Sequence, residues 1–281
     1  MPRTRCSDDA PQLTLLLPGP MMHPTTLSTL RRGLASLLLL LVACAGPAAE
    51  DTAEASRQSD FHYQLSLGHY RAREVPHAIE ELTEAIRLYP QNPDAHFMLG
   101  FIFQGRQEYT RAIVEYRRAL ELRPGWFEVR NNLGSIYLAT ADWQAAVDIF
   151  LPLTEEPTYR TPGNAHNNLG WALYKMRRYD EAAEHFRSAV QFQPELCQGY
   201  NNQGLTYEAL GQPADARKAY ESCIARSGCK RYAEPRYRLA NLLLTSGDVD
   251  GALAQFQSCA EAEVGTQFAD SCREYLKAAG R

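Results

Sequence analysis

A period of about 34 residues runs through the chain from residue 59 onward, and it restricts the possible folds more than any other feature. Six copies begin near residues 59, 93, 127, 163, 197 and 233, at spacings of 34, 34, 36, 34 and 36 residues. Position 20 of every copy is alanine: Ala78, Ala112, Ala146, Ala182, Ala216 and Ala252. A small residue repeated at one position lets two helices approach closely. The pattern therefore predicts a stack of similar helix pairs.

The copies also share apolar and glycine positions, which are clearest in the copy from residue 93: Leu99, Gly100, Phe103, Tyr109, Ala112, Tyr116, Ala119 and Pro124. This pattern resembles the tetratricopeptide repeat. The resemblance implies an all-α fold, a tetratricopeptide-repeat superhelix of six repeats, each a pair of antiparallel helices, A and B. We expect the glycine or alanine at position 8 to face the alanine at position 20. The aromatic residue at position 24 is then expected to fill the wedge toward the next repeat.

The repeats extend over residues 59–265, and the two longer spacings predict insertions in the loops 157–163 and 228–234. Residues 266–281 are predicted to form a capping helix with Thr266 as its N-cap. Apolar residues recur at helical spacing on one face of this helix: Phe268, Cys272, Tyr275 and Leu276. Such a face would cover the apolar end of the last repeat.

No catalytic or cofactor-binding constellation is evident in the sequence. It lacks a glycine-rich phosphate loop and a His-Glu-x-x-His pair. His62, His96 and His166 share repeat position 4, but Arg130 interrupts the column, so we expect no metal site and no cofactor. Six repeats and a cap leave no residues for a catalytic domain. We therefore expect neither an enzyme nor a small-molecule substrate.

The N-terminal part of the chain has the features of a secretory signal. The basic pair Arg31-Arg32 precedes an apolar run from Leu34 to Val42, which is too short for a transmembrane helix. The run ends in Leu41-Val42-Ala43-Cys44, which resembles the bacterial lipobox. That resemblance implies a signal peptide over residues 22–43, acylation of Cys44, and attachment to a membrane through the N-terminal acyl chains.

The residues around this motif predict where the protein resides. Ala45 follows Cys44, whereas an aspartate there retains lipoproteins at the inner membrane in the best-known sorting system. The resemblance thus implies the outer membrane, with the protein on its periplasmic face. Residues 44–58 have few large apolar groups, which predicts a flexible tether after the lipidated cysteine. Residues 1–21 fit no part of a signal peptide, and we interpret them as an overhang before a true start at Met21 or Met22.

The charge balance argues against nucleic acid as a partner. Lys and Arg number 29 and Asp and Glu 33, for a net charge of −4. Proteins that bind nucleic acid usually present a basic face, so no nucleic-acid partner is expected.

Five cysteines lie after residue 190: Cys197, Cys223, Cys229, Cys259 and Cys272. An oxidising periplasm favours disulfides between them. Cys259 and Cys272 lie symmetrically about the turn at residues 264–266, so antiparallel helices would place them side by side, and this is the first pairing expected. Cys223 and Cys229 would touch if Gly228 is the left-handed residue that ends a helix. A competing pairing joins Cys197 to Cys223, at repeat positions 1 and 27. One thiol is left over in either case.

In tetratricopeptide-repeat proteins, positions 2, 5, 9, 12 and 13 of helix A line the inner groove. The residues that form the candidate partner-binding groove here are Tyr63, Leu67, Tyr70, Phe97, Phe101, Asn131, Leu138, Asn167, Trp171, Tyr174, Asn201, Leu205 and Tyr237. Large apolar groups at these positions are predicted to have no structural role within the array, and exposed apolar patches usually mark partner sites. The alternative is that they bury one another. The asparagine amides suit hydrogen bonds to an extended or helical segment of a partner.

A lipobox, a tether, six tetratricopeptide repeats and a short helical end are together similar to the type IV pilus pilotins, the PilF/PilW family. The resemblance covers residues 22–281. It implies an outer-membrane lipoprotein that binds the secretin PilQ and promotes its localisation in that membrane or its multimer assembly. Two alternatives stay open. One is a lipid-anchored scaffold for outer-membrane barrel assembly or for a protease, and the other is an activator of a peptidoglycan-synthesising enzyme.

Overall fold

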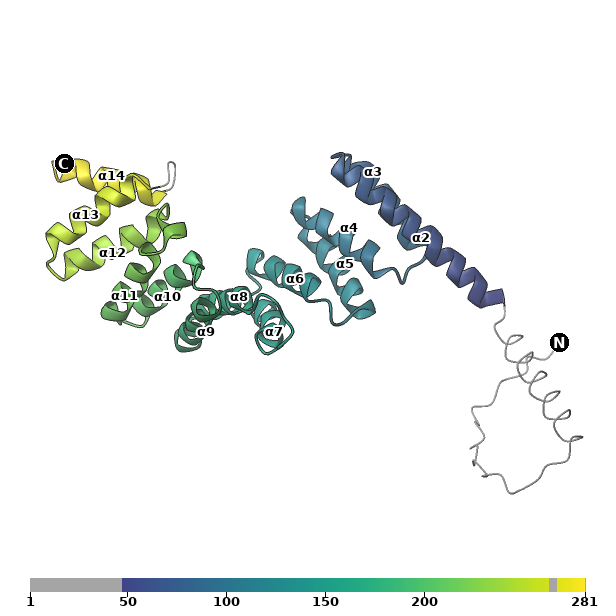
Figure 1. The fold of residues 1–281 in the computed structure, drawn as a ribbon, viewed down its shortest axis with the longest axis horizontal. Helices are drawn as coiled ribbons and strands as arrows, with labels where there is room; N and C mark the ends of the chain where they lie inside the picture. Colours follow the sequence, from purple (N-terminus) through teal and green to yellow (C-terminus); the bar gives the residue numbers. More distant parts are fainter. Residues whose placement is uncertain (1–46, 263–266, 281) are drawn as a thin grey trace, which may run out of the picture. The chain divides into compact units, whose positions relative to one another are not determined.

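Helices make up all the regular structure in the described residues, which are 47–262 and 267–280 of this computed structural model (Figure 1). Six helix pairs are followed by a single helix: α2 (Pro47–Arg71) and α3 (Val75–Leu88), α4 (Pro93–Gly105) and α5 (Tyr109–Leu122), α6 (Phe127–Ala139) and α7 (Trp143–Thr154), α8 (Pro162–Lys175) and α9 (Tyr179–Phe192), α10 (Cys197–Ala209) and α11 (Pro213–Ile224), α12 (Ala233–Thr245) and α13 (Val249–Ala260), and α14 (Gln267–Ala278). A 3-10 turn, η1 (Ser227–Cys229), lies between α11 and α12. The predicted all-α repeat fold is confirmed.

Helix α2 begins before the first repeat, at Pro47, and is 25 residues long. Residues 47–58 are therefore helical, and the prediction of a flexible tether across them is wrong. Alanine and glutamate are frequent in this segment and favour helix. The chain divides into two units after Glu54, and the described residues of the first unit are this start of α2.

The predicted signal peptide, Cys44 and Thr266 lie outside the described residues. Among the helices of residues 47–262 and 267–280, none combines the length and the apolar character needed to cross a membrane.

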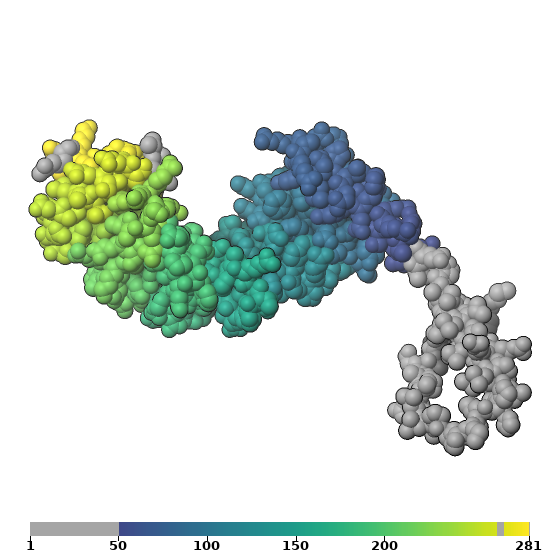
Figure 2. Space-filling model, in the orientation of Figure 1, coloured from purple at the N-terminus to yellow at the C-terminus, as the bar shows by residue number. Residues whose placement is uncertain are grey.

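Within residues 55–281, each helix pair packs against the next in chain order (Figure 2). Helix B of one repeat contacts helix A of the following repeat, as α7 does with α8, and consecutive A helices also touch, as α4 does with α6. The last helix, α14, packs on α12 and α13, as a cap should. All six alanines at position 20 are fully buried. The close-packed positions inferred from the repeat thus lie in the core.

The glycines at position 8 pack against the position-24 ring of their own repeat. A Cβ atom on Gly134 would lie 2.6 Å from the Phe150 ring, and a Cβ atom on Gly204 would lie 2.3 Å from the Tyr220 ring. Both separations are far below an ordinary carbon–carbon contact. The expected contact between positions 8 and 20 is therefore corrected, because the ring, and not the alanine, lies nearest to the glycine.

The turn between helices A and B has the same backbone conformation in all six repeats. Position 15 has a positive φ, between 59° and 85°, in every repeat: Arg73, Gln107, Ala141, Arg177, Gly211 and Gly247. The next N–H then bonds the carbonyl oxygen five residues earlier, as Glu74 does with His69 at 2.9 Å. The left-handed conformation favours glycine, yet four of these six positions carry another residue. Tertiary packing therefore imposes the turn.

Two disulfides bond the C-terminal part of the array. Cys259 and Cys272, the pairing expected first, join α13 to α14 with Cα atoms 6.1 Å apart. Cys197 joins Cys229 with Cα atoms 5.5 Å apart, so both pairings predicted for Cys223 are wrong. The reason lies in the loop before α12. Helix α11 ends at Ile224, and Gly228 lies in η1 without a positive φ, so no left-handed helix end carries Cys229 onto Cys223.

Cys223 is a buried free thiol beside the first disulfide. Its Sγ donates a hydrogen bond to the carbonyl oxygen of Cys197 at 3.4 Å, so these two residues do face each other across the repeat. Burial raises the pKa of the Cys223 thiol to about 11. The thiol is therefore protonated at neutral pH, which makes it a poor nucleophile.

Candidate functional site

The most exposed part of the predicted groove lies on the first two repeats. Tyr70 near the end of α2 and Phe101 in α4 are 36% and 40% exposed, and their ring centroids lie 6.0 Å apart. Phe97, one helical turn before Phe101, lies 6.3 Å from it and 4.8 Å from Trp126, again between ring centroids. These four rings are termed the aromatic patch. They join the A helices of repeats 1 and 2 to the N-cap of α6.

A charged pair lies beside the aromatic patch. The Arg123 guanidinium lies 4.1 Å from the centroid of the Trp126 ring and forms an ion pair with Asp94 at 2.8 Å. An apolar centre with a polar rim is typical of protein–protein interfaces. Trp126 is not among the residues predicted from the sequence, because it lies in the turn before α6 and not in helix A. A large aromatic residue after Pro124-Gly125 is the signal that could have identified it.

Two further groove residues, Trp171 and Tyr174, stack on each other in repeat 4. Their ring centroids lie 5.4 Å apart, with only 8° between the ring planes. Tyr179 lies 5.4 Å from the Tyr174 ring, and the Lys175 ammonium lies 4.5 Å from the Trp171 ring. Both residues are half-buried. They form a second, flatter aromatic surface with a cation at its edge.

Several predicted groove residues are used inside the array. Leu205 is only 8% exposed, and Tyr237 lies 6.3 Å from the Phe256 ring and 5.5 Å from the Phe268 ring of the cap. Six others are half-buried and pack against the core: Tyr63, Leu67, Phe97, Leu138, Trp171 and Tyr174. For these eight residues, the prediction that they have no structural role is wrong. The rings against Tyr237 lie outside the predicted groove, so its burial does not come from groove residues covering one another.

The asparagines at position 5 bond mainly within the chain. Asn167 is 5% exposed and accepts a hydrogen bond from the Asn202 amide at 3.1 Å. Asn201 is 6% exposed and donates to Glu234 at 3.1 Å, while its Oδ1 has no partner among the described residues. The Oδ1 atom of Asn131 accepts a long hydrogen bond from the Tyr159 hydroxyl at 3.5 Å. The predicted role in binding a partner is therefore wrong for Asn167, whose amide is buried and engaged.

A polar network that the sequence did not predict links repeats 5 and 6. Arg238 forms ion pairs with Glu234 at 2.9 Å and with Glu208 at 3.6 Å. The Tyr220 hydroxyl donates a hydrogen bond to Glu208. Burial of the ring raises the pKa of Tyr220 well above its usual value. The network holds the Tyr220 ring in place over Gly204. Because its members come from three helices, repeat spacing alone could not identify it.

The position-4 histidines do not gather into a column. Each contacts position 23 of its own repeat through Nδ1: His62 with Glu81 at 2.6 Å, His96 with Glu115 at 2.7 Å, and His166 with His185 at 3.0 Å. Burial, and then the proximity of His185, lowers the pKa of His166 to about 4, so its ring is neutral at neutral pH. These pairs link helix A to helix B within a repeat.

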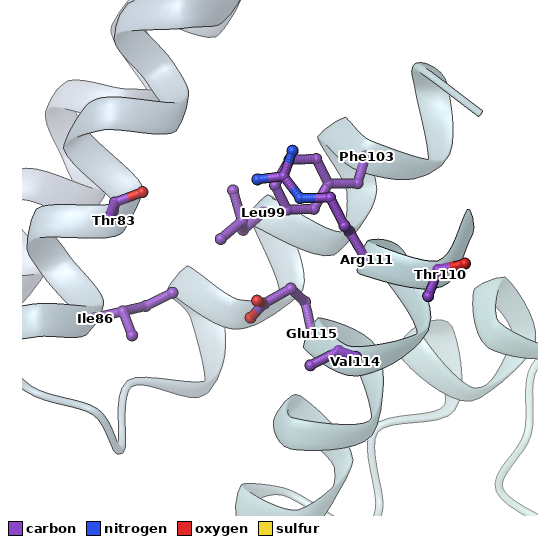
Figure 3. A pocket seen from close by; sticks show the side chains of 8 residues that line it. All are labelled: Thr83, Ile86, Leu99, Phe103, Thr110, Arg111, Val114 and Glu115. Carbon is purple, nitrogen blue, oxygen red and sulfur yellow. The ribbon is translucent and has the colours of Figure 1, made fainter. Parts of the chain in front are cut away.

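A pocket of about 380 Å³ lies between α3 and the α4–α5 pair (Figure 3). Ile86 extends toward it from α3, and the Arg111 guanidinium lies 3.8 Å from the centroid of the Phe103 ring. Val114 on its rim is 60% exposed. One repeat later, equivalent positions line a pocket of about 440 Å³: Arg117, Leu120, Glu121, Leu133, Tyr137, Ala145, Asp148 and Ile149. The packing of neighbouring repeats therefore produces this kind of pocket, and it recurs at the next repeat.

Sequence comparison matches the tetratricopeptide repeat family to residues 63–125, 163–196 and 201–263, which together make up more than half of the chain. The chain is 27% identical over 132 residues to the type IV pilus assembly protein PilF of Pseudomonas aeruginosa, a match that covers 47% of this chain and 52% of PilF. It is 26% identical over 199 residues to the BBSome complex member BBS4 of Bos taurus, covering 69% of this chain and 36% of BBS4. The matches thus span about half or less of these curated relatives.

Solved structures show the same fold. The structure of Pseudomonas aeruginosa PilF superposes with a TM-score of 0.63 at 21% identity, over 79% of this chain and 99% of that chain. PilW, described as a widely conserved type IV pilus biogenesis factor, superposes with a TM-score of 0.62 at 20% identity, over 76% of this chain and 97% of that chain. At these identities the likeness establishes the architecture alone.

Proposed function

Because the chain belongs to the tetratricopeptide-repeat family and is related to PilF and PilW, we propose that it acts in type IV pilus assembly as a protein-binding scaffold. The observation that carries the proposal is the aromatic patch. Two exposed rings and two half-buried rings adjoin there across neighbouring repeats, beside the Asp94–Arg123 ion pair. Aromatic residues of this kind often supply most of the energy of a protein interface.

The proposed partner is the secretin PilQ, in the form of a subunit that has not yet joined its multimer. An unassembled subunit exposes apolar segments that the multimer later buries, and an aromatic patch suits such a segment. The match to PilF supports this choice over the other scaffold roles that the sequence left open. In this role the chain holds the subunit by adhesion and performs no covalent chemistry.

The proposal places the protein at the outer membrane, anchored by acyl chains on Cys44 and facing the periplasm. The lipobox-like residues Leu41–Cys44 support this location, as does Ala45 in place of a retention aspartate. Anchoring confines the scaffold to a thin layer at the membrane, which raises its effective concentration for a partner that must insert there. Two disulfides, which an oxidising compartment favours, are consistent with the same side of the cell envelope.

Truncation of the aromatic patch should weaken secretin binding without unfolding the array. We expect Tyr70→Ala and Phe101→Ala each to lower affinity for purified PilQ by about thirtyfold, since truncation at an interface hot spot costs about 2 kcal/mol. Titration of immobilised full-length protein with PilQ measures this. Cells that carry either variant should have few pili and few secretin multimers at normal abundance of the scaffold.

Phe61→Ala is the matched control, because Phe61 is a 60% exposed ring on the same helix, α2, but lies outside the aromatic patch. It should bind PilQ as the wild type does. Trp171→Ala tests the second aromatic surface in the same assay. If Tyr70→Ala and Phe101→Ala bind PilQ normally, the aromatic patch is not the working surface. If wild-type protein does not bind PilQ at all, the proposed partner is wrong.

Removal of the predicted lipidation site should mislocalise a folded protein. Cys44 precedes every repeat, so Cys44→Ala is expected to leave the array intact and to abolish membrane attachment. Fractionation of the cell envelope, combined with labelling by a radioactive fatty acid, measures both effects. Attachment of Cys44→Ala to the outer membrane at the wild-type level would contradict the proposed anchor.

A further inference from the structure

The turn between α2 and α3 brings together two histidines and a glutamate that have no role in the proposed function. His69 lies in the last turn of α2, Glu74 immediately precedes α3, and His77 lies in its first turn. One ligand atom from each residue lies within 4.8 Å of the other two. The His69 Nδ1 is 2.7 Å from the Glu74 Oε2, and the two imidazole centroids are 5.4 Å apart.

The backbone fixes the spacing of these side chains. Arg73 has a φ of 65°, which reverses the chain, and the N–H of Glu74 donates to the carbonyl oxygen of His69 at 2.9 Å. Glu74 is the N-cap residue of α3, but its side chain makes no capping hydrogen bond to the helix. Its carboxylate therefore points to the histidine instead. Each ligand position is held by a helix end or by a hydrogen-bonded turn.

The other repeats have the same turn but not the same residues. Position 11, occupied by His69 here, is apolar or aromatic elsewhere: Phe103, Tyr137, Leu173, Tyr207 and Leu243. Position 19, occupied by His77, is Arg111, Ala145, Glu181, Asp215 or Gly251. The combination is thus confined to the first repeat. The shared repeat position of the other histidines does not reveal this group, because its three residues occupy different repeat positions and meet across a turn.

We propose that His69, Glu74 and His77 bind a zinc ion. Imidazole nitrogen and carboxylate oxygen are ordinary zinc ligands, and two histidines with one carboxylate form a known donor set with one open position. Donors of this borderline character suit zinc better than they suit calcium or magnesium, which prefer oxygen ligands alone. The side chains are exposed or half-buried, so they move the short distance needed to converge on one ion.

A zinc ion here would cross-link the two helices of the first repeat. That repeat has no preceding repeat in residues 55–281 to pack against it, so a cross-link at its turn adds order where the array has fewest neighbours. A ligand that binds the native state alone raises the stability of that state by mass action. The first repeat also carries Tyr70, one residue from His69, so the metal site and the aromatic patch share helix α2.

Two other pairs in the chain provide internal controls. His62–Glu81 and His96–Glu115 have the same His–Glu contact, at 2.6 and 2.7 Å, but neither belongs to a group of three ligands within the described residues. His62 and Glu81 lie on the same two helices as the proposed site. They should therefore report whether a histidine–carboxylate pair alone retains zinc.

The experiment is a calorimetric titration of ZnCl₂ into full-length protein that has been stripped with EDTA, carries no affinity tag and retains its disulfides. Wild-type protein should bind one zinc ion per chain with a rise in melting temperature. Even partners outside the ligand shell are each worth about tenfold or more in metal affinity, so His77→Ala and Glu74→Gln should weaken binding by at least that factor. Both positions are exposed, so neither variant should disturb the fold without metal.

His62→Ala is the matched control and should retain wild-type zinc affinity. The proposal is overturned if wild-type protein binds no zinc at a concentration of 0.1 mM, or if His77→Ala and Glu74→Gln bind as tightly as the wild type. It is also overturned if His62→Ala loses as much affinity as His77→Ala. A zinc-dependent rise in melting temperature that persists in His77→Ala would likewise place the ion elsewhere.

Discussion

Gly204→Val is expected to unfold the C-terminal repeats at a temperature about 10 °C below that of the wild type. A Cβ atom at this position would lie 2.3 Å from the Tyr220 ring, closer than at any other position-8 glycine. Tyr220 is fully buried, and its hydroxyl is held by Glu208, which also forms an ion pair with Arg238. The ring therefore has no free space to move into. Overpacking of this kind lowers the free energy of unfolding by about 1–3 kcal/mol or more.

Gly68→Val is the matched control for this prediction. Gly68 also lies inside an A helix, α2, but beyond its chain neighbours and the backbone of its own helix nothing lies within 4 Å of its Cβ position. Valine is at least as good a helix former as glycine, so this variant should melt at or slightly above the wild-type temperature. Circular dichroism at 222 nm follows both melts. Equal melting temperatures for Gly204→Val and Gly68→Val would show that the Tyr220 ring swings aside.

The glycines at position 8 show which part of the helix packing can be predicted from the sequence. A fixed period and an alanine at position 20 of every repeat were sufficient to locate the six helix pairs, because only close contacts demand small residues at regular spacing. The period does not say which side chain fills the space over a small residue. Tyr220 and Phe150 cover Gly204 and Gly134, a contact that depends on ring orientation. The sequence therefore predicted the small positions and misassigned their partners.

The candidate binding surface was predicted less completely than the fold. Tyr70 and Phe101 are exposed as expected, but Leu205 and Asn167 are buried by their neighbours. Helix position alone does not determine exposure, because the residues on the next helix decide how much of each side chain is covered. Trp126 lies outside helix A, so a rule based on helix A positions could not include it.

One disulfide could be predicted from local helix geometry, whereas the other depends on how the chain folds between two repeats. Cys259 and Cys272 were paired from symmetry about a turn, which needs only the antiparallel arrangement of two helices. The partner of Cys197 depends on the course of residues 225–232, where η1 carries Cys229 toward α10. A three-residue 3-10 turn has no periodic signature in a sequence. The sequence predicted the first pairing and failed on the second for this reason.

Replacement of both Cys259 and Cys272 by alanine is expected to release the capping helix. Closure of a loop of this size stabilises a protein by about 3 kcal/mol in the chain-entropy model, and the two residues are 13 apart in the sequence. Helix α14 packs on α12 and α13, and its Phe268 and Tyr275 rings contact Tyr237 and Phe256 there. Without the cross-link, α14 should fray while the N-terminal repeats stay folded, because each repeat depends mainly on its neighbours.

Amide hydrogen exchange measures this loss segment by segment. Amides of α14 should exchange about a hundredfold faster in the Cys259→Ala/Cys272→Ala variant, the factor that about 3 kcal/mol represents, whereas amides of α4 and α5 should keep their wild-type rates. The double replacement avoids a lone thiol that could pair with Cys223. Cys223→Ala is the control, since it removes a buried sulfur without breaking a cross-link and should leave α14 protected. Wild-type protection of α14 in the double variant would mean that the rings of Phe268 and Tyr275 hold the cap without the disulfide.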